Sequence, residues 1–183
     1  MKIHAVIDTN VIVSAILTHN QESPTKLILA KVRNGQITPM INPAIMEEYI
    51  DVLSRSKFRL KQDVIQEIRC LFEVRGSQFD PEISEYCFID PDDQVFYETY
   101  RMVEDAYLIT GNKRHYPVEP RIVSPTEMIS VIELAEISSG NILKLTTFLA
   151  KYSILLKSSP SVKPTSSTKP PSILPTTSLS IVT

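Results

Sequence analysis

Short apolar segments alternate with segments of helical periodicity along most of this chain, and that order limits the folds it can adopt. Ile3–Ile7 is a mostly apolar run of the length of a buried strand, and the segment 10–18 that follows carries apolar residues at helical spacing. Because strands that alternate with helices are usually parallel and joined by crossovers, the pattern predicts an α/β fold with a mostly parallel central sheet. Helices are expected to cover both faces of that sheet.

The other elements follow from the same periodicities and from residues that start or stop helices. Ser23-Pro24 begins a helix that Gly35 stops, and Ser124-Pro125-Thr126-Glu127 fits a capping box. Pro39 has no amide hydrogen for a neighbouring strand, so its strand is expected near an edge of the sheet. Strands are expected over 3–7, 36–41, 86–89, 107–110 and 121–123, and helices over 10–18, 24–34, 43–53, 61–74, from the aspartates at 90–93 to Val103, and from Pro125.

The chain divides into one domain and two appended segments. Residues 1–136 carry the alternating pattern, and 137–156 is a helical extension whose apolar face is expected to pack on the core or, as the weaker alternative, to meet a partner. Residues 157–183 contain 13 Ser or Thr and 5 Pro among 27 residues. Such a composition buries too little apolar surface to offset the entropy of ordering, so we expect a disordered tail.

Charge and hydropathy exclude several classes of protein. The formal charge is −2, and residues 157–183 hold three lysines and no acid, which leaves −5 on residues 1–156. A domain of that charge does not grip nucleic acid by bulk positive charge. No apolar run reaches the roughly 18 residues that cross a bilayer, and Asp8 interrupts the N-terminal run too early for a signal peptide. We expect a cytoplasmic protein without a membrane partner.

The two cysteines point to neither a metal site nor a disulfide framework. Cys70 and Cys87 lack metal-ligand spacing and are too few to staple a fold. We expect both to be buried small apolar residues.

Polar clusters follow three of the predicted strands. Asp8 ends the first strand, Asp90-Pro91-Asp92-Asp93 follows a later one, and Thr110-Gly111-Asn112 follows the next. Because sites in open α/β sheets form outside the carboxyl ends of the strands, these clusters are expected to converge on one pocket. Glu48 lies in the first turns of the helix after the second strand, and it borders the same pocket if its neighbour Tyr49 points inward.

The acids in these clusters suit a hard dication. Magnesium typically takes one or two carboxylates and keeps several waters, and carboxylates held together repel unless a cation compensates them. We therefore predict a Mg²⁺ or Mn²⁺ site formed by Asp8, Glu48 and Asp93.

Each of these residues also has a structural explanation. Asp8 could simply end its strand, Glu48 could be an exposed helix residue, and one or two of the aspartates at 90–93 could cap a helix. Asn112 could be an ordinary turn residue after glycine. The coincidence of all the clusters at strand ends favours the site.

Four short motifs occur in order along the predicted elements. They are Asp8-Thr9-Asn10-Val11, Pro43 through Glu48-Tyr49 to Leu53, Asp90-Pro91-Asp92-Asp93 with Phe96 three places on, and Leu108-Ile109-Thr110-Gly111-Asn112-Lys113. Over about residues 1–130 the chain resembles the PIN-domain nucleases, particularly the toxin components of prokaryotic type II toxin–antitoxin pairs. Any one motif is weak, but four in order on the right elements are a strong signal.

The resemblance implies a three-layer α/β/α domain with a magnesium- or manganese-dependent endoribonuclease site. It also implies a homodimer and a cognate antitoxin that silences the toxin. Asp8, Glu48 and Asp93 match the acids that hold the metal, Asn10 matches the residue that orients them, and Thr110 and Asn112 fall on the motif that closes the pocket. Many relatives carry an aspartate in place of Asn112 and another near His115, so the fourth corner is poor in acid here and a second ion is in doubt.

Further roles follow from metal-dependent hydrolysis of RNA. Asp8 and Asp93 are expected to be ligands, and Glu48 is either a third ligand or the base that positions the attacking water. Lys113 and Arg114 are either phosphate contacts or solvated loop charges. Ser14 is expected to support Asn10 from one helical turn away.

Two other functions compete with ribonuclease activity. One is a non-catalytic PIN-like module that holds RNA or a protein partner in the same pocket, which the absence of the fourth acid favours. The other is a phosphohydrolase acting on small phosphate esters, but Asp8-Thr9-Asn10 lacks the second acid that such an enzyme would need. His115, a single loop histidine, is left out of the catalytic set.

Overall fold

The computed structural model describes residues 2–81, 88 and 91–138. Apart from Phe88, the predicted strand at 86–89 lies outside these residues. The tail at 157–183 and all but the first two residues of the predicted extension at 137–156 also lie outside them.

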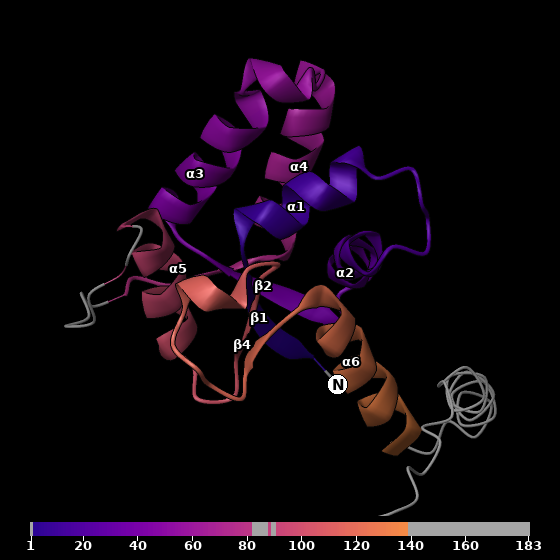
Figure 1. The fold of residues 1–183 in the computed structure, drawn as a ribbon, viewed down its shortest axis with the longest axis vertical. Coiled ribbons are helices and arrows are strands. Elements are labelled where there is room, and N and C mark those ends of the chain that lie inside the picture. The colour runs from indigo at the N-terminus through magenta and orange to yellow at the C-terminus, as the bar shows by residue number, and fades with distance from the viewer. Residues whose placement is uncertain (1, 82–87, 89–90, 139–183) are drawn as a thin grey trace, which may run out of the picture.

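Five parallel strands form the central sheet (Figure 1). Their order is β3-β2-β1-β4-β5, so the chain moves outward from β1 on one side and then returns to build the other. This topology confirms the predicted parallel sheet. The strands are β1 (Ile3–Ile7), β2 (Ile37–Ile41), β3 (Ser77–Gln78), β4 (Tyr107–Ile109) and β5 (Ile122–Val123).

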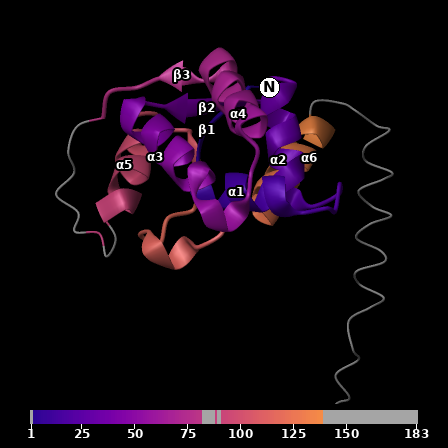
Figure 2. The ribbon, with the colours of Figure 1, turned by 90° about the horizontal axis from the view of Figure 1, so that it is seen from above.

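Helices cover both faces of the sheet and complete the predicted three-layer α/β/α architecture. Helix α5 packs on β1, β2 and β4, whereas α2 and α4 pack on β2, and α6 packs on β5 and α2. Figure 2 shows α5 and α2 on opposite sides of the strands. The helices are α1 (Thr9–Leu17), α2 (Pro24–Arg33), α3 (Pro43–Ser54), α4 (Gln62–Arg75), α5 (Pro91–Arg101) and α6 (Pro125–Ser138), with short 3-10 helices η1 (Ser56–Phe58) and η2 (Lys113–His115).

Local sequence signals set the ends of these helices. The Asn42 side chain accepts a hydrogen bond from the Ile45 amide at 2.8 Å and so caps α3. Ser124 and Glu127 exchange side-chain and backbone hydrogen bonds, which confirms the predicted capping box at the start of α6. Gly35 adopts φ +76°, a left-handed conformation that suits glycine, directly after α2.

The central strands are buried on both faces, and this fixes the position of the site. Ala5, Val6 and Ile7 of β1 are inaccessible to solvent, as are Leu108 and Ile109 of the adjacent strand β4. Polar residues begin immediately after each of these strands, at Asp8 and Thr110. The apolar core therefore gives way to polar residues at the carboxyl edge of the sheet.

Three details differ from the sequence predictions. The strand with Pro39 lies between β1 and β3, but β3 pairs only with Met40 and Ile41, so the missing amide hydrogen of Pro39 interrupts no bond to β3. The two-residue strand β3 was not predicted, because it is too short to show a periodicity. Cys70 was expected to be buried and is exposed on α4, while Cys87 lies outside the described residues.

Within residues 2–81, 88 and 91–138, no helix combines the length and the apolar character needed to span a bilayer.

Candidate active site

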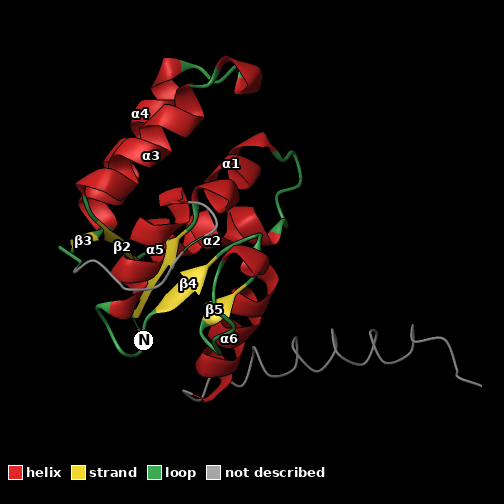
Figure 3. Ribbon diagram, turned by 60° about the vertical axis from the view of Figure 1, so that its left-hand side comes forward, coloured by secondary structure: helices red, strands yellow, loops and turns green. Residues whose placement is uncertain are grey.

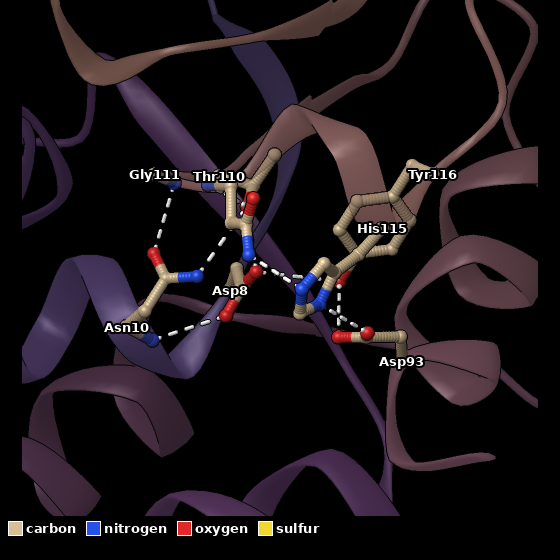
Figure 4. Close-up of polar contacts among 8 residues, drawn as sticks. Asp8, Asn10, Asp93, Thr110, Gly111, His115 and Tyr116 are labelled. Carbon is tan, nitrogen blue, oxygen red and sulfur yellow. Dashed lines mark hydrogen bonds and ion pairs between the residues drawn. The ribbon is translucent and has the colours of Figure 1, made fainter. Parts of the chain in front are cut away.

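Asp8 lies where β1 ends and α1 begins, and three side-chain or backbone donors hold its carboxylate (Figure 4). Oδ1 accepts the Asn10 amide at 3.0 Å, and Oδ2 accepts the Thr110 hydroxyl at 2.7 Å and the Tyr116 hydroxyl at 3.3 Å. Asp8 therefore does cap a helix, as the structural explanation of this residue allows. The contacts with Thr110 and Tyr116 go beyond a cap, because these two residues follow β4 and do not belong to α1.

Burial raises the pKa of the Asp8 carboxyl above its ordinary value. The hydrogen bonds from Thr110 and Asn10 act in the opposite direction, the negative charge of Asp93 raises the pKa further, and the bond from Tyr116 lowers it. The net effect is that the ionised form of Asp8 is disfavoured in the folded chain. A neighbouring cation would relieve both the burial of this charge and its repulsion by Asp93.

Asp93, in the first turns of α5, reaches the same group of side chains from another element. Its Oδ2 lies 2.8 Å from Nδ1 of His115, and its Oδ1 accepts the Tyr116 hydroxyl at 3.1 Å. Tyr116 is buried and touches Asp8 as well, so one hydroxyl connects the two carboxylates. Burial and the charges of Asp8 and Asp93 raise the pKa of the Tyr116 phenol, which keeps this hydroxyl protonated.

Glu48 shares a cavity with Asp8. Tyr49 points into the core and donates a hydrogen bond to the Ile7 carbonyl, which turns the neighbouring Glu48 toward the end of β1. The condition that the sequence set for Glu48 is thus met. The cavity has a volume of about 340 Å³ and is lined by Asp8, Thr9, Asn10, Val13, Ser14, Glu48, Val52 and Phe58.

Asn10 and Thr110 join the start of α1 to the loop after β4. The Asn10 side chain accepts the Gly111 amide at 2.9 Å and donates to the Thr110 hydroxyl at 3.4 Å. The Thr110 hydroxyl also accepts the Asn112 amide at 2.9 Å, while it donates to Asp8. Figure 4 shows Asn10, Thr110 and Gly111 gathered on one side of Asp8. Of the predicted supporting residues, Asn10 and Thr110 therefore contact Asp8 directly, and Asn112 contacts Thr110.

The remaining predicted residues lie around this centre. The Lys113 ammonium forms an ion pair with the Glu127 carboxylate at 3.0 Å. The hydrogen bond from the Ser124 amide lowers the pKa of Glu127, and the contact with Lys113 lowers it further. Arg114 is exposed, and within the described part of the chain it makes no ion pair. Ser14 lines the cavity, with its hydroxyl 3.5 Å from that of Thr25.

Three residues near the carboxylates were missed by the sequence analysis. Tyr116 follows the predicted motif by several residues, and only the folded loop brings its hydroxyl to Asp8. His115 was set aside as incidental, yet its ring nitrogens lie against Asp93 and the Asn112 amide. Thr9 lines the cavity, and its buried hydroxyl has no hydrogen-bond partner among the described residues.

The chemistry of these donors fits a hard divalent cation. Asp8 and Glu48 supply carboxylate oxygens to one cavity. Thr9 lines the same cavity, and its hydroxyl has no hydrogen-bond partner among the described residues. Within residues 2–81, 88 and 91–138, however, no group of three or more His, Cys, Asp or Glu side chains is assembled at ligating distance. Asp93 is held on the far side of the Tyr116 hydroxyl, so its role as a third ligand stays a prediction.

The parallel sheet and the acids at its carboxyl edge define a class of protein, and comparison with known families identifies it. A family model described as PIN domain matches residues 4–114. The chain belongs to the PIN domain family. This confirms the resemblance that the four motifs indicated.

A match to a solved structure covers about two thirds of the chain. The crystal structure of VapBC2 from Rickettsia felis bound to a DNA fragment from their promoter matches over 67% of this chain and 97% of that chain, with 20% sequence identity and a TM-score of 0.43. None of the curated proteins compared with the chain matches it.

Proposed function

We propose that the protein is a magnesium- or manganese-dependent endoribonuclease and the toxin of a toxin–antitoxin pair. Membership of the PIN domain family supports the nuclease, because members of this family are generally nucleases. One observation carries the proposal. The buried carboxylate of Asp8 shares a cavity with Glu48 and the hydroxyl of Tyr116 with Asp93, which supports a site centred on Asp8.

Asp8, Glu48 and Asp93 would hold the ion. The chemistry that a divalent cation supplies at such a site is polarisation of the scissile phosphate and activation of water. Asn10 and Thr110 fix the direction of the Asp8 carboxylate through their hydrogen bonds. In this proposal Glu48 either binds the ion or accepts a proton from the attacking water at its carboxylate.

The basic residues after β4 are proposed to contact the phosphate backbone of RNA. Arg114 is exposed and available for such a contact. Lys113 would have to exchange its exposed contact with Glu127 for a phosphate, and an ion pair of this kind contributes only about 0–1 kcal/mol. Partners proposed from the family resemblance are a cognate antitoxin and a second copy of the chain, with activity in the cytoplasm.

A non-catalytic PIN-like module that binds RNA or a protein is the second candidate. Two observations favour it. Asn112 occupies a position where many relatives carry an acid, and the carboxylates of Asp8 and Asp93 already have hydrogen-bond partners within the chain.

Cleavage of a labelled single-stranded RNA separates the two candidates. We expect the full chain to cut this RNA with Mn²⁺ or Mg²⁺, and Asp8→Asn or EDTA to reduce cutting to background. Glu67→Gln is a matched control, since Glu67 is exposed and pairs with Arg33 far from the site. Binding without cutting favours the second candidate, and cutting that survives EDTA or Asp8→Asn contradicts the proposed mechanism.

A further inference from the structure

The loop between α3 and α4 concentrates positive charge in a chain that is acidic overall. Arg55, Lys57, Arg59 and Lys61 occur at every second position of the segment 55–61, and all four are exposed. Arg55 pairs with Asp51. Within the described part of the chain, Lys57, Arg59 and Lys61 form no ion pair. Three cations on one short loop are therefore available to an external anion.

An aromatic residue in the middle of this loop connects the cations to the candidate active site. Phe58 ends the short helix η1, is half-buried, and lines the same cavity as Asp8 and Glu48. Val13 and Val52 line that cavity as well. The cavity thus has carboxylates from the end of β1 and from α3, and an apolar part that includes an aromatic ring.

The arrangement of α3 and α4 places this loop away from the sheet. The two helices contact each other, and Figure 3 shows their connection at the end remote from the strands. At Arg59 the backbone adopts φ 51°, the one left-handed conformation outside glycine among the described residues. Arginine adopts this conformation at a cost that glycine or asparagine would largely avoid, and such conformations often occur at functional sites.

We propose that the loop 55–61, which we call the basic loop, is a binding subsite for single-stranded RNA. Phe58 stacks on the base next to the scissile phosphate, and Lys57, Arg59 and Lys61 contact neighbouring phosphates. Aromatic stacking combined with backbone cations is the usual means of holding a single strand without reading its sequence. The Lys57 ammonium lies over the Phe58 ring, 4.8 Å from its centre, so the aromatic ring and one of the cations are adjacent.

The volume and charge of the site favour RNA over an apolar ligand. A cavity of about 340 Å³ is at the lower end of the range for small-ligand pockets, enough for part of a nucleotide. The acidic body of the chain repels RNA at long range, so a local group of cations is needed to bring the strand to the carboxylates. The inference rests on the proposed function for the position of the scissile phosphate, but binding to the basic loop can be measured without cleavage.

Fluorescence anisotropy of a labelled twelve-nucleotide RNA tests the subsite on the full wild-type chain in EDTA. Phe58→Leu keeps an apolar residue in the cavity and removes the ring, and we expect about tenfold weaker binding. Phe58→Tyr should bind like the wild type. Replacement of Lys57, Arg59 and Lys61 by Gln together should flatten the slope of log affinity against log salt by about 2.

Arg75→Gln is the matched control for charge. Arg75 is exposed in the last turn of α4, at the opposite end of that helix from the basic loop. We expect this variant to keep both the affinity and the salt slope of the wild type. An equal loss per removed charge in Arg75→Gln and in the loop variant would overturn the proposal, because it would indicate bulk charge instead of a subsite.

The outcome is separable from that of the proposed function. If RNA binding depends on Phe58 but the wild type never cleaves with Mn²⁺, the subsite stands and the nuclease is wrong. If the wild type cleaves but Phe58→Leu leaves both binding and KM unchanged, the subsite is wrong and the nuclease stands. Binding of an acidic peptide at the loop with no binding of RNA would also overturn the proposal.

Discussion

Asp8 and Asp93 are joined by the hydroxyl of Tyr116, which lies 3.3 Å from one carboxylate and 3.1 Å from the other. Asp8 follows β1 and Asp93 lies in α5, far apart in the sequence, and Tyr116 comes from the loop after β4. One phenolic proton thus lies between two like charges. In the absence of a cation, this proton partly offsets the repulsion between the two carboxylates. A divalent cation bound in the same region would offset that repulsion more strongly than the proton does.

Replacing Asp8 should stabilise the metal-free protein. Burial and the charge of Asp93 raise the pKa of Asp8 above its ordinary value of 3.8, so its ionised form opposes folding. Asp8→Asn removes that charge, and we expect a higher Tm at pH 7 in EDTA together with loss of RNA cleavage. A lower Tm would mean that the hydrogen bonds to Asp8 outweigh its burial.

The raised pKa of Asp8 also predicts how the stability of the folded chain depends on pH. Because the folded chain binds the Asp8 proton more tightly than the unfolded chain, the contribution of Asp8 to stability falls as pH rises from about 3.8 through the raised folded pKa. The stability advantage of Asp8→Asn should therefore be small at pH 3.5, grow through this window, and then level off. Urea unfolding of both proteins across pH measures it, and an advantage that shrinks with rising pH contradicts the assignment.

Tyr116→Phe tests the shared hydroxyl. Its loss removes hydrogen bonds to two carboxylates, and we expect about 1 kcal/mol lower free energy of unfolding in EDTA. Mn²⁺ should reduce this deficit, because a cation also offsets the repulsion between Asp8 and Asp93. Tyr100→Phe is the control, since Tyr100 donates to Glu119 at 2.9 Å, away from the site, and its deficit should not respond to Mn²⁺.

Gly111→Ala tests the support of the carboxylates. A Cβ atom at Gly111 would lie 2.9 Å from Oδ1 of Asn10, the atom that accepts the Gly111 amide. The Asn10 side chain must then move, and we expect a loss of about 1 kcal/mol of stability and a reduced rate of RNA cleavage. Unchanged cleavage would show that Asn10 does not position Asp8.

Asn112→Asp tests the acid-poor corner of the site. Asn112 lies against His115, which in turn contacts Asp93, so a carboxylate here would extend the group of acids. We expect the variant to bind a further equivalent of Mn²⁺ by calorimetry compared with the wild type. An unchanged number of bound ions would show that this corner plays no part in holding metal.

The sequence predicted the sheet and the positions of several candidate-site residues because both depend on local patterns. Apolar runs marked β1 and β4, and the polar residues directly after them had to lie at the carboxyl edge once the strands were parallel. The position of Glu48 followed from the helical register of Tyr49, which the structure confirms.

Other features depend on contacts that no local pattern reveals. Tyr116 and His115 reach Asp93 only because the loop after β4 turns back over α5. The strand β3 is two residues long, so its pairing with β2 is decided by packing instead of periodicity. Phe58 joins the cavity from a loop that the sequence analysis did not assign to the site.

Titration calorimetry with MnCl₂ tests the central claim most directly, namely that Asp8, Glu48 and Asp93 together bind one divalent ion. We expect the wild type to bind Mn²⁺, and Asp8→Asn, Glu48→Gln and Asp93→Asn each to weaken binding by about tenfold or more, while the exposed control Glu67→Gln leaves it unchanged. A wild type that binds no Mn²⁺, or binding that all three substitutions leave intact, would contradict the account.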